Sequence, residues 1–404
     1  MGQDTTEIVI TGRWIQMKRY DNKINVLFII MQMGMGGSER LVHNLVQKLD
    51  RKLFNPSVAW FFGDKILKEF QELKVPLYHV PKVKRIDFSA MEKVGRIIRD
   101  NNIHIVNAHH FMSLIYSYYG CKINNKAKLI YTEHSEWEIE RVSFKWRIIG
   151  RYLLNRTDAA VGVSSAIAKQ IENKYKTADS KIITVQNGVD LNVFRNNGKK
   201  AKLREKMGIA NDEKIIGIVA NFKKVKNHIF LLRAFDELIK VINNVKLLLI
   251  GQGFEGDEEN TESELRRFIV EKKLEKNIIF MGYRSDIPEL LGIMDVFCLT
   301  SLKEGLPISL IEAMASGLPV VGTDVEGIRD VIIPDKNGIL VEVGDVIGLR
   351  NALNTLIREE YLMKKYGEKS RNLARKIYSL DRCIKQYEDL FVATVESARV
   401  DAGR

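Results

Sequence analysis

Short apolar runs rich in β-branched residues alternate with amphipathic segments along most of the chain. In the first half these runs are "INVLFII", "HIVNAHH", "KLIYTEH", "AAVGVSS" and "KIITVQNG". In the second half they are "KIIGIVANF", "KLLLIGQG", "NIIFMGY", "DVFCLTS", "PVVGTDV" and "GILVEV". Stretches between them, such as "NHIFLLRAFDELIKVI" and "ESELRRFIVEKKL", have the apolar spacing of helices. This alternation predicts α/β architecture, with parallel sheets covered by helices on both faces.

The two series of runs predict two doubly wound domains. A length of 404 residues also suits two domains better than one. Residues 187–202, "NGVDLNVFRNNGKKAK", are rich in turn residues and charge, so we place the hinge there. We assign residues 1–22 to an N-terminal extension, 23–190 to the first domain and 191–379 to the second. The last amphipathic segment, residues 380–397, is predicted to be a helix that packs back on the first domain.

The composition and the net charge indicate in which compartment the protein works and what kind of partner it binds. The chain has no apolar stretch of about eighteen residues that would span a bilayer, and its start does not look like a signal peptide. Its three cysteines are far apart, which favours a reducing compartment such as the cytoplasm and argues against structural zinc. The net charge of +12 indicates an anionic partner. A phosphorylated substrate or an anionic membrane surface fits better than nucleic acid, because no nucleic-acid motif accompanies the charge.

"GMGGSER", residues 34–40, follows the first apolar run directly and holds three glycines within four residues. Glycine is costly to order, so such a cluster indicates a tight turn or the close approach of a ligand. Ligands of open α/β sheets bind beyond the carboxyl ends of the strands. We therefore expect this loop to line a cleft between the two domains; a plain tight turn is the alternative.

The segment "SLKEGLPISLIEAMASGLPVVGTDVEGIRDVI", residues 301–332, carries Glu304 and Glu312 with seven residues between them. Pro307 suits the first position of a helix. The N–H groups at such a helix start attract phosphate. Because proline has no N–H, the donors must be its neighbours Leu306, Ile308 and Ser309. Glu312, one turn deeper, is placed to accept hydrogen bonds from sugar hydroxyls. The alternative is that both glutamates face solvent, as two glutamates at such a spacing usually do.

The run "EGLPISLIEAMASGLPVVGTDVEGIRDVI" closely resembles the donor-binding segment of family-4 glycosyltransferases (glycosyl transferases group 1). These are retaining enzymes of the GT-B fold, two Rossmann-like domains that face a cleft. The resemblance extends over residues 25–390, where "MGMGGSER" is similar to the first glycine loop, "VQNGVD" to the interdomain segment and "VKNHIFLLRAF" to the pyrophosphate-binding segment. It implies transfer of a sugar from a nucleotide donor to an acceptor, with the anomeric configuration retained.

The resemblance also implies roles on the donor side. Glu312 matches the glutamate that binds the donor ribose, and Glu304 matches the one near the transferred sugar. A carboxylate there would hold sugar hydroxyls and stabilise positive charge at the anomeric carbon. The backbone around Gly305, Leu306 and Ile308 would hold the sugar and the diphosphate.

In the first domain, Gly36 and Gly37 would let the backbone approach the donor phosphates. Arg284, after "FMGY", would lie near the donor base, whereas its neighbour Asp286 equally suits a helix cap.

A nucleoside diphosphate leaves with negative charge, which a cation must stabilise. Lys226 matches the family's lysine. The family's arginine falls on Asn221, and Lys223 and Lys224 are the candidates to replace it, each with a point charge in place of a bidentate fork. Solvated surface lysines are the alternative. Glycosyltransferases of the GT-A fold hold a metal with a D-x-D motif. No D-x-D triplet occurs in this sequence, so we expect no metal and no other cofactor.

"NAHHF" places His109 and His110 at a strand end, where the family has a histidine near the donor sugar. His109 is the better match, and adjacent strand residues point to opposite faces, so we expect one of the two to face the cleft. "TEHSEWE" places His134 at the next strand end. We assign His134 and Ser38 to acceptor binding.

The acceptor side also carries "RVSFKWRIIGRYLLNR", in which basic side chains alternate with aromatic and aliphatic ones. Its cations are Arg141, Lys145, Arg147, Arg151 and Arg156. Such a segment suits an anionic membrane surface; a core helix with a solvated basic face is the alternative. We hypothesise a lipid-linked saccharide or other glycan acceptor at the inner face of the membrane, in cell-surface polysaccharide or glycolipid synthesis.

The resemblance makes uridine the expected nucleotide and leaves guanosine and adenosine donors open. Two other functions also stay open. A non-catalytic nucleotide-sugar-binding partner is favoured by Asn221, and a sugar-nucleotide epimerase of the same architecture is disfavoured by the E-x7-E segment.

Overall fold

A computed structural model describes residues 7–10, 13–16, 23–34, 36–84, 86–124, 127–134, 139, 143–194, 200–254 and 256–402. The chain divides into two compact units. Unit 1 comprises Met1–Asn187 and Leu380–Arg404, and unit 2 comprises Gly188–Ser379. The division after Asn187 lies three residues before the end predicted for the first domain.

Unit 1 is built on a seven-stranded parallel sheet in the order β5-β4-β3-β6-β7-β8-β9. Its strands are β3 (Ile24–Gln32), β4 (Phe54–Phe62), β5 (Leu77–His79), β6 (Ile105–His109), β7 (Lys128–Glu133), β8 (Ala159–Gly162) and β9 (Ile182–Thr184). Within this sheet the chain runs from β3 outward through β4 to β5, then crosses back to β6 and continues in the other direction to β9. The strand order therefore reverses between β3 and β6, which makes their carboxyl ends the expected ligand position.

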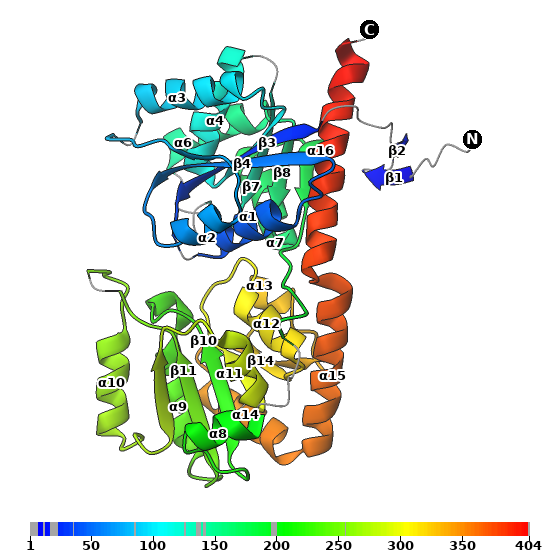
Figure 1. Ribbon diagram of the computed structural model, residues 1–404. Helices are drawn as coiled ribbons and strands as arrows, with labels where there is room; N and C mark the ends of the chain where they lie inside the picture. Colours follow the sequence, from blue (N-terminus) through cyan, green and yellow to red (C-terminus); the bar gives the residue numbers. More distant parts are fainter. Residues whose placement is uncertain are drawn as a thin grey trace. The chain divides into compact units, whose positions relative to one another are not determined.

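Helices cover both faces of this sheet (Figure 1). They are α1 (Gly37–Lys48), α2 (Leu67–Glu72), α3 (Phe88–Asp100), α4 (Phe111–Asn124), α6 (Phe144–Leu154), α7 (Ser165–Tyr175) and α16 (Leu380–Ala402). Helices α1, α2 and α16 share one core with β3, in which the rings of Phe28 and Phe391 lie 6.0 Å apart. On the other face α3, α4, α6 and α7 pack in a row. Burial on both faces explains why β3 reads as a continuous apolar run rather than an alternation.

Strands β4 and β5 were not predicted from the sequence. Strand β4, "FNPSVAWFF", contains Pro56, and proline argues against a central strand. The structure resolves the conflict, because β5 pairs only with Val58–Trp60. At Pro56 one side of β4 therefore has no neighbouring strand that needs an N–H, and the proline is tolerated.

Unit 2 holds a six-stranded parallel sheet in the order β12-β11-β10-β13-β14-β15. Its strands are β10 (Lys214–Val219), β11 (Val245–Ile250), β12 (Ile278–Gly282), β13 (Val296–Leu299), β14 (Val320–Thr323) and β15 (Gly338–Val341). All six coincide with runs predicted from the sequence. Here the order reverses between β10 and β13, which pair directly. Both units are thus Rossmann-like, and the predicted α/β class is confirmed.

The helices of unit 2 are α8 (Lys200–Lys206), η2 (Lys224–Lys226), α9 (His228–Leu238), α10 (Glu262–Glu271), α11 (Ile287–Ile293), α12 (Ile308–Ser316), α13 (Glu326–Arg329), α14 (Val346–Arg358) and α15 (Glu360–Ile377). Within the predicted extension, β1 (Glu7–Ile10) and β2 (Arg13–Gln16) form an antiparallel pair. In the part of the chain that the structure describes, no helix is both long and apolar enough to cross a bilayer.

Candidate active site

The point of strand-order reversal in unit 2 brings together two loops that are far apart in sequence. One loop follows β10 and contains η2; the other follows β13 and leads to α12. They are tied by backbone and hydroxyl contacts: Leu302 N–H donates to the Val225 carbonyl at 2.8 Å, and the Thr300 hydroxyl donates to the Asn227 carbonyl at 3.1 Å. The sequence-predicted residues of both loops therefore share one place at the carboxyl edge of the sheet.

An ion pair forms at this place. Lys226 Nζ lies 2.6 Å from Glu304 Oε1, and the hydroxyl of Ser301 donates to the same oxygen at 2.6 Å. The side chain of Glu304 is 9% exposed and that of Lys226 is 26% exposed. A partly buried ion pair is desolvated enough to interact strongly, yet its cation stays accessible to an incoming anion. Ser301, which also holds Glu304, was not predicted from the sequence.

Glycine is required on the far side of this loop. A Cβ added to Gly327, in α13, would lie 2.2 Å from the backbone carbonyl oxygen of Glu304. This contact with backbone cannot be relieved by rotating a side chain, so Gly327 lets α13 support the loop that carries Glu304. The packing gives a physical reason for a glycine in the motif "GIRDVI".

Helix α12 begins one residue later than predicted, because Pro307 is its N-cap and Ile308 its first residue. The first helical turn leaves the N–H groups of Ile308 and Ser309 without intrahelical acceptors. Leu306 is buried, whereas Gly305 is half-buried. Glu312 lies in the second turn, as predicted, and is half-buried.

The other residues predicted to contact the donor do not take part in the ion pair of Lys226 and Glu304. Asn221 lies in the loop after β10, two residues beyond the end of the strand, and is exposed. Lys223 Nζ pairs with Asp257 at 2.8 Å, and this lysine holds the pKa of Asp257 below its usual value. Arg284 follows β12, an edge strand, and its Nε donates to Asp286 Oδ1 at 2.7 Å. Asp286 is the N-cap residue of α11, but its carboxylate binds Arg284 rather than the helix N–H groups.

His228, the first residue of α9, was missed by sequence reasoning although it directly follows the predicted lysine loop. Its ring is buried and packs edge-on against Phe222, with centroids 5.0 Å apart. Burial, and then the nearby Lys226 cation, lowers the pKa of His228 to about 4. The imidazole is therefore neutral, and it adds no second positive charge beside Lys226.

At the matching edge of unit 1, the glycine loop leads into α1. Gly36 is the N-cap with extended backbone, and both Gly36 and Gly37 are exposed. The Ser38 hydroxyl, by contrast, is largely buried and donates to Glu39 Oε2 at 2.7 Å. A buried carboxylate thus occupies the first turn of α1, where it is stabilised by the helix dipole. The roles predicted for Gly36, Gly37 and Ser38 stay predictions.

A chain of polar side chains lies at the carboxyl ends of β6 and β7. His109 Nδ1 is 2.8 Å from His134 Nε2, and His109 Nε2 is 3.0 Å from Asn107 Oδ1. Asn107 Nδ2 donates to the Thr132 hydroxyl at 2.9 Å. Asn107 and His109 are fully buried, and His134 is half-buried. Asn107 was not predicted, although its position two residues before His109 on the same strand face was a usable signal.

The hydrogen-bond partners fix the tautomers of His109 and His134. Since the amide N–H group of Asn107 donates to Thr132, its oxygen faces His109, and His109 Nε2 must carry the proton. His109 Nδ1 is then an acceptor, so His134 Nε2 must donate to it. His134 Nδ1 is then unprotonated and carries a lone pair. It is a buried atom with no hydrogen-bond partner among the described residues.

Both imidazoles are neutral. Burial, and then the nearby His110, lowers the pKa of His109 to about 3. The same causes, with His109 added, hold the pKa of His134 well below its usual value. A neutral His134 with a free lone pair can accept a hydrogen bond from a hydroxyl group.

The expectation that His109 and His110 point to opposite faces is wrong. Strand β6 ends at His109, and His110 has left-handed backbone with φ of 70°, so the strand alternation stops there. The rings of both residues lie about 5 Å from that of His134, at 5.1 Å and 5.0 Å between centroids. His110 Nδ1 also lies 3.5 Å from a carboxylate oxygen of the buried Glu133.

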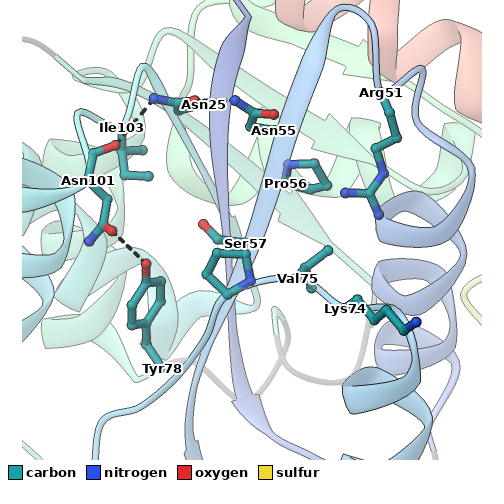
Figure 2. Close-up of a pocket in the computed structure, with 11 residues that line it drawn as sticks. Asn25, Arg51, Asn55, Pro56, Ser57, Lys74, Val75, Tyr78, Asn101 and Ile103 are labelled. Carbon is teal, nitrogen blue, oxygen red and sulfur yellow. Dashed lines mark hydrogen bonds between the residues drawn. The ribbon is translucent and has the colours of Figure 1, made fainter.

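A hollow of about 340 Å³ lies at the opposite, amino edge of the unit 1 sheet (Figure 2). It is lined by Asn25, Arg51, Asn55, Pro56, Ser57, Lys74, Val75, Pro76, Tyr78, Asn101 and Ile103. Several of these side chains bond to one another, as Tyr78 does to Asn101 at 2.7 Å. Because β3 and β4 each span nine residues, this hollow is about 25 Å from the carboxyl edge. It is separate from the predicted site.

Family models match most of the chain. The model for glycosyl transferases group 1 matches residues 199–373, and the model for glycosyltransferase family 4 matches residues 35–193. The chain belongs to the family-4, group 1 glycosyltransferases. The segment carrying Lys226, Glu304 and Glu312 lies inside the first match, and the segment carrying His109 and His134 lies inside the second.

Named relatives of this glycosyltransferase align over most of their length. It is 27% identical over 325 residues, 80% of this chain and 83% of the relative, to an N-acetyl-alpha-D-glucosaminyl L-malate synthase from Bacillus anthracis. It is 21% identical over 394 residues, 94% of this chain and 99% of the relative, to the UDP-Gal:alpha-D-GlcNAc-diphosphoundecaprenol alpha-1,3-galactosyltransferase from Escherichia coli.

Solved structures show the same fold. HepE from Anabaena in complex with UDP is similar with a TM-score of 0.83 and 20% identity, over 92% of this chain and 100% of HepE. A complex of HepE with UDP-glucose gives a TM-score of 0.81 at 21% identity, over 93% and 100% of the two chains. The glycosyltransferase therefore has the GT-B fold predicted from its sequence.

Proposed function

We propose that this glycosyltransferase moves a sugar from a UDP-sugar to a lipid-linked saccharide or other glycan, with retention of the anomeric configuration and without a metal. The place of action is the cytoplasmic side of the membrane, in the synthesis of cell-surface polysaccharide or glycolipid. One observation carries the proposal: Lys226 and Glu304 lie 2.6 Å apart where the strand order of unit 2 reverses.

The chemistry follows from what each group offers. The bond between the anomeric carbon and the diphosphate oxygen breaks, a bond to an acceptor hydroxyl oxygen forms, and the proton of that hydroxyl passes to the departing diphosphate. The ammonium of Lys226 is the cation placed to stabilise the departing diphosphate. The Glu304 carboxylate, held by Ser301, is placed to bind sugar hydroxyls and to oppose positive charge at the anomeric carbon. The first N–H groups of α12 add further donors for the diphosphate.

The nucleotide and the acceptor class are inferred from relatives. HepE was solved with UDP and with UDP-glucose. The Escherichia coli relative is named for a UDP-Gal donor and a diphosphoundecaprenol-linked acceptor. These names support a uridine donor and a lipid-linked acceptor for this chain.

The test is a panel of UDP-, GDP- and ADP-sugars with EDTA present, using wild type, Glu312→Ala and the matched control Glu368→Ala, which removes an exposed glutamate of unit 2. Binding and hydrolysis of one UDP-sugar by wild type and control, lost in Glu312→Ala, supports the proposal. A requirement for a divalent metal, or binding unaffected by Glu312→Ala, overturns the assigned site. The anomeric proton coupling of the transferred sugar in the product reports retention directly.

A second candidate is a non-catalytic partner that binds nucleotide sugars. It is favoured by Asn221, an exposed amide where the family has an arginine. This candidate predicts tight UDP-sugar binding with no turnover on any acceptor.

A further inference from the structure

Three helices of unit 1 present an exposed apolar and basic surface that the site does not use. It comprises the outer faces of α6 and α4 and the start of α3. We name it the α3–α4–α6 surface. We infer that this surface docks the enzyme on an anionic lipid bilayer. The inference deepens the lipid-linked acceptor of the proposed function by naming the part of the chain that meets the lipid.

Helix α6 is apolar on two sides. Its inner side holds Gly150, Leu153 and Leu154, which are buried. A Cβ added to Gly150 would lie 2.4 Å from the ring of Tyr175, so the helix is seated closely on the unit. Its outer side nevertheless exposes Phe144 (66%) and Ile148 (56%). A surface helix normally has a polar outer side, so these exposed side chains indicate a partner.

The exposed apolar side chains continue across α4 to α3. The rings of Tyr152 on α6 and Tyr118 on α4 lie 6.1 Å apart, and those of Tyr119 on α4 and Phe88 on α3 lie 6.4 Å apart. Phe88 is 69% exposed. Figure 1 shows the three helices together on one side of the unit 1 sheet. The surface is therefore continuous, and the sequence could not show this because α3 and α6 are about fifty residues apart.

The charge on the α4 and α6 part of this surface has one sign, whereas the start of α3 also carries Asp87 and Glu92. Helices α4 and α6 contain no aspartate or glutamate. Their exposed cations and the one that follows are Lys122, Lys145, Arg147, Arg151 and Arg156. None of these five pairs with a carboxylate within the described part of the chain, whereas Arg147 and Arg156 lie over the rings of Phe144 and Tyr152. Arg141, also named from the sequence, lies outside the described residues.

An anionic bilayer fits this combination better than a protein. Cations bind lipid headgroups while their stems and the neighbouring aromatic and aliphatic side chains enter the boundary with the acyl chains. A second copy of this chain is disfavoured, because pairing α4 and α6 of one copy with those of another would bring only like charges together. The partner of the α3–α4–α6 surface is therefore a membrane that contains anionic lipid.

The test is co-sedimentation with vesicles of phosphatidylcholine alone or mixed with phosphatidylglycerol. Wild type is expected to bind the mixed vesicles, and Arg147→Ala with Arg151→Ala to bind about 25-fold more weakly, at about fivefold for each charge. Phe144→Ser with Ile148→Ser is expected to lose at least about tenfold. The matched control is Val270→Ser with Tyr361→Ser, two exposed apolar side chains of unit 2, and it should bind like wild type.

Three results would overturn the inference: no binding to the mixed vesicles, equal binding to phosphatidylcholine alone, or a change of oligomeric state on gel filtration in the α6 variants with no loss of vesicle binding. Thermal melts confirm that each variant is folded. UDP titration of the same samples keeps the two proposals separate, because the surface variants should bind UDP like wild type. Vesicle binding without UDP binding would remove the proposed function and leave the surface.

Discussion

The two sheets of this glycosyltransferase have the same kind of strand reversal, yet their carboxyl edges carry different chemistry. Unit 2 places an ion pair there, Lys226 with Glu304 at 2.6 Å. Unit 1 places a neutral chain of hydrogen bonds there, from Asn107 through His109 to His134. The same backbone arrangement thus supports an ion pair at the edge of one sheet and a chain of neutral side chains at the edge of the other.

The difference matches what the two substrates of the proposed reaction need. A departing diphosphate carries negative charge, so a cation stabilises it. An acceptor hydroxyl is neutral until it reacts, and a neutral imidazole lone pair is a suitable partner for it. Burial keeps the two histidines of unit 1 uncharged, because it lowers both pKa values. Fold alone does not set function; the side chains at the strand ends do.

The largest effect is expected from Lys226→Ala. Removing the cation that we propose stabilises the leaving group should lower kcat about 100- to 1000-fold, measured as UDP release at saturating donor. The matched control is Lys223→Ala, a lysine of the same loop whose ammonium is paired with Asp257 at 2.8 Å. Its loss should cost less than about tenfold, since it is not in the ion pair at the reversal point. A larger loss in Lys223→Ala than in Lys226→Ala would assign the wrong lysine to the leaving group.

A smaller loss is expected from Asn107→Leu. The substitution removes the acceptor that sets the His109 tautomer, so kcat should fall about 10- to 100-fold while the Kd for UDP is unchanged. Nitrogen NMR shifts of His134 should show that the proton is no longer fixed on Nε2. Asn55→Leu makes the same change at the opposite edge of the sheet and should alter neither value. A loss of UDP affinity in Asn107→Leu would show that the neutral edge also binds the donor.

A gain is expected from Asn221→Arg. This exposed position can hold an arginine without displacing buried side chains. A bidentate contact with the diphosphate should tighten UDP binding about fivefold, or about 1 kcal/mol. Asn221→Lys, which supplies only a point charge, should gain less. Equal affinity in wild type and both variants would mean that the position does not reach the diphosphate.

The smallest effect concerns acid stability. A histidine that stays neutral when folded binds protons only in the unfolded state between its folded pKa and 6.5, so stability falls as the pH falls through that window. For His109, from about pH 7 to about pH 6, the loss is about 0.7 kcal/mol.

Unit 1 has three histidines with a lowered pKa, His43, His109 and His134, of which the last two lie at its edge, and unit 2 has one, His228. Hydrogen-exchange mass spectrometry should therefore show unit 1 losing protection faster than unit 2 on acidification. His109→Gln should reduce this difference. Equal loss in both units would contradict the neutral-edge description.

Much of unit 2 could be predicted from the sequence. Its six strands are buried apolar runs bounded by turn residues, and such runs are visible without knowledge of the fold. Lys226 and Glu304 were both named, because each lies in a segment that resembles a donor-binding segment of family-4 glycosyltransferases. Their 2.6 Å contact was not predicted, since it depends on β10 and β13 being neighbours.

Unit 1 was less predictable for physical reasons. Pro56 hid β4, and the length of β5 that makes this proline tolerable is a property of the sheet. The Asn107–His109–His134 chain depends on the register of β6 against β7, which pairs His109 with Thr132. Left-handed backbone at His110 then breaks the alternation on which the prediction relied. The roles predicted for Gly36, Arg284 and Glu312 stay predictions.

Calorimetric titration of UDP in the presence of EDTA would show whether the charged edge of unit 2 holds the nucleotide. The proteins to compare are wild type, Glu312→Ala and His134→Ala. Glu312→Ala is expected to weaken UDP binding at least about tenfold, because a hydrogen bond to a charged group is lost. His134→Ala is expected to bind UDP like wild type. Retained affinity in Glu312→Ala together with lost affinity in His134→Ala would contradict this expectation.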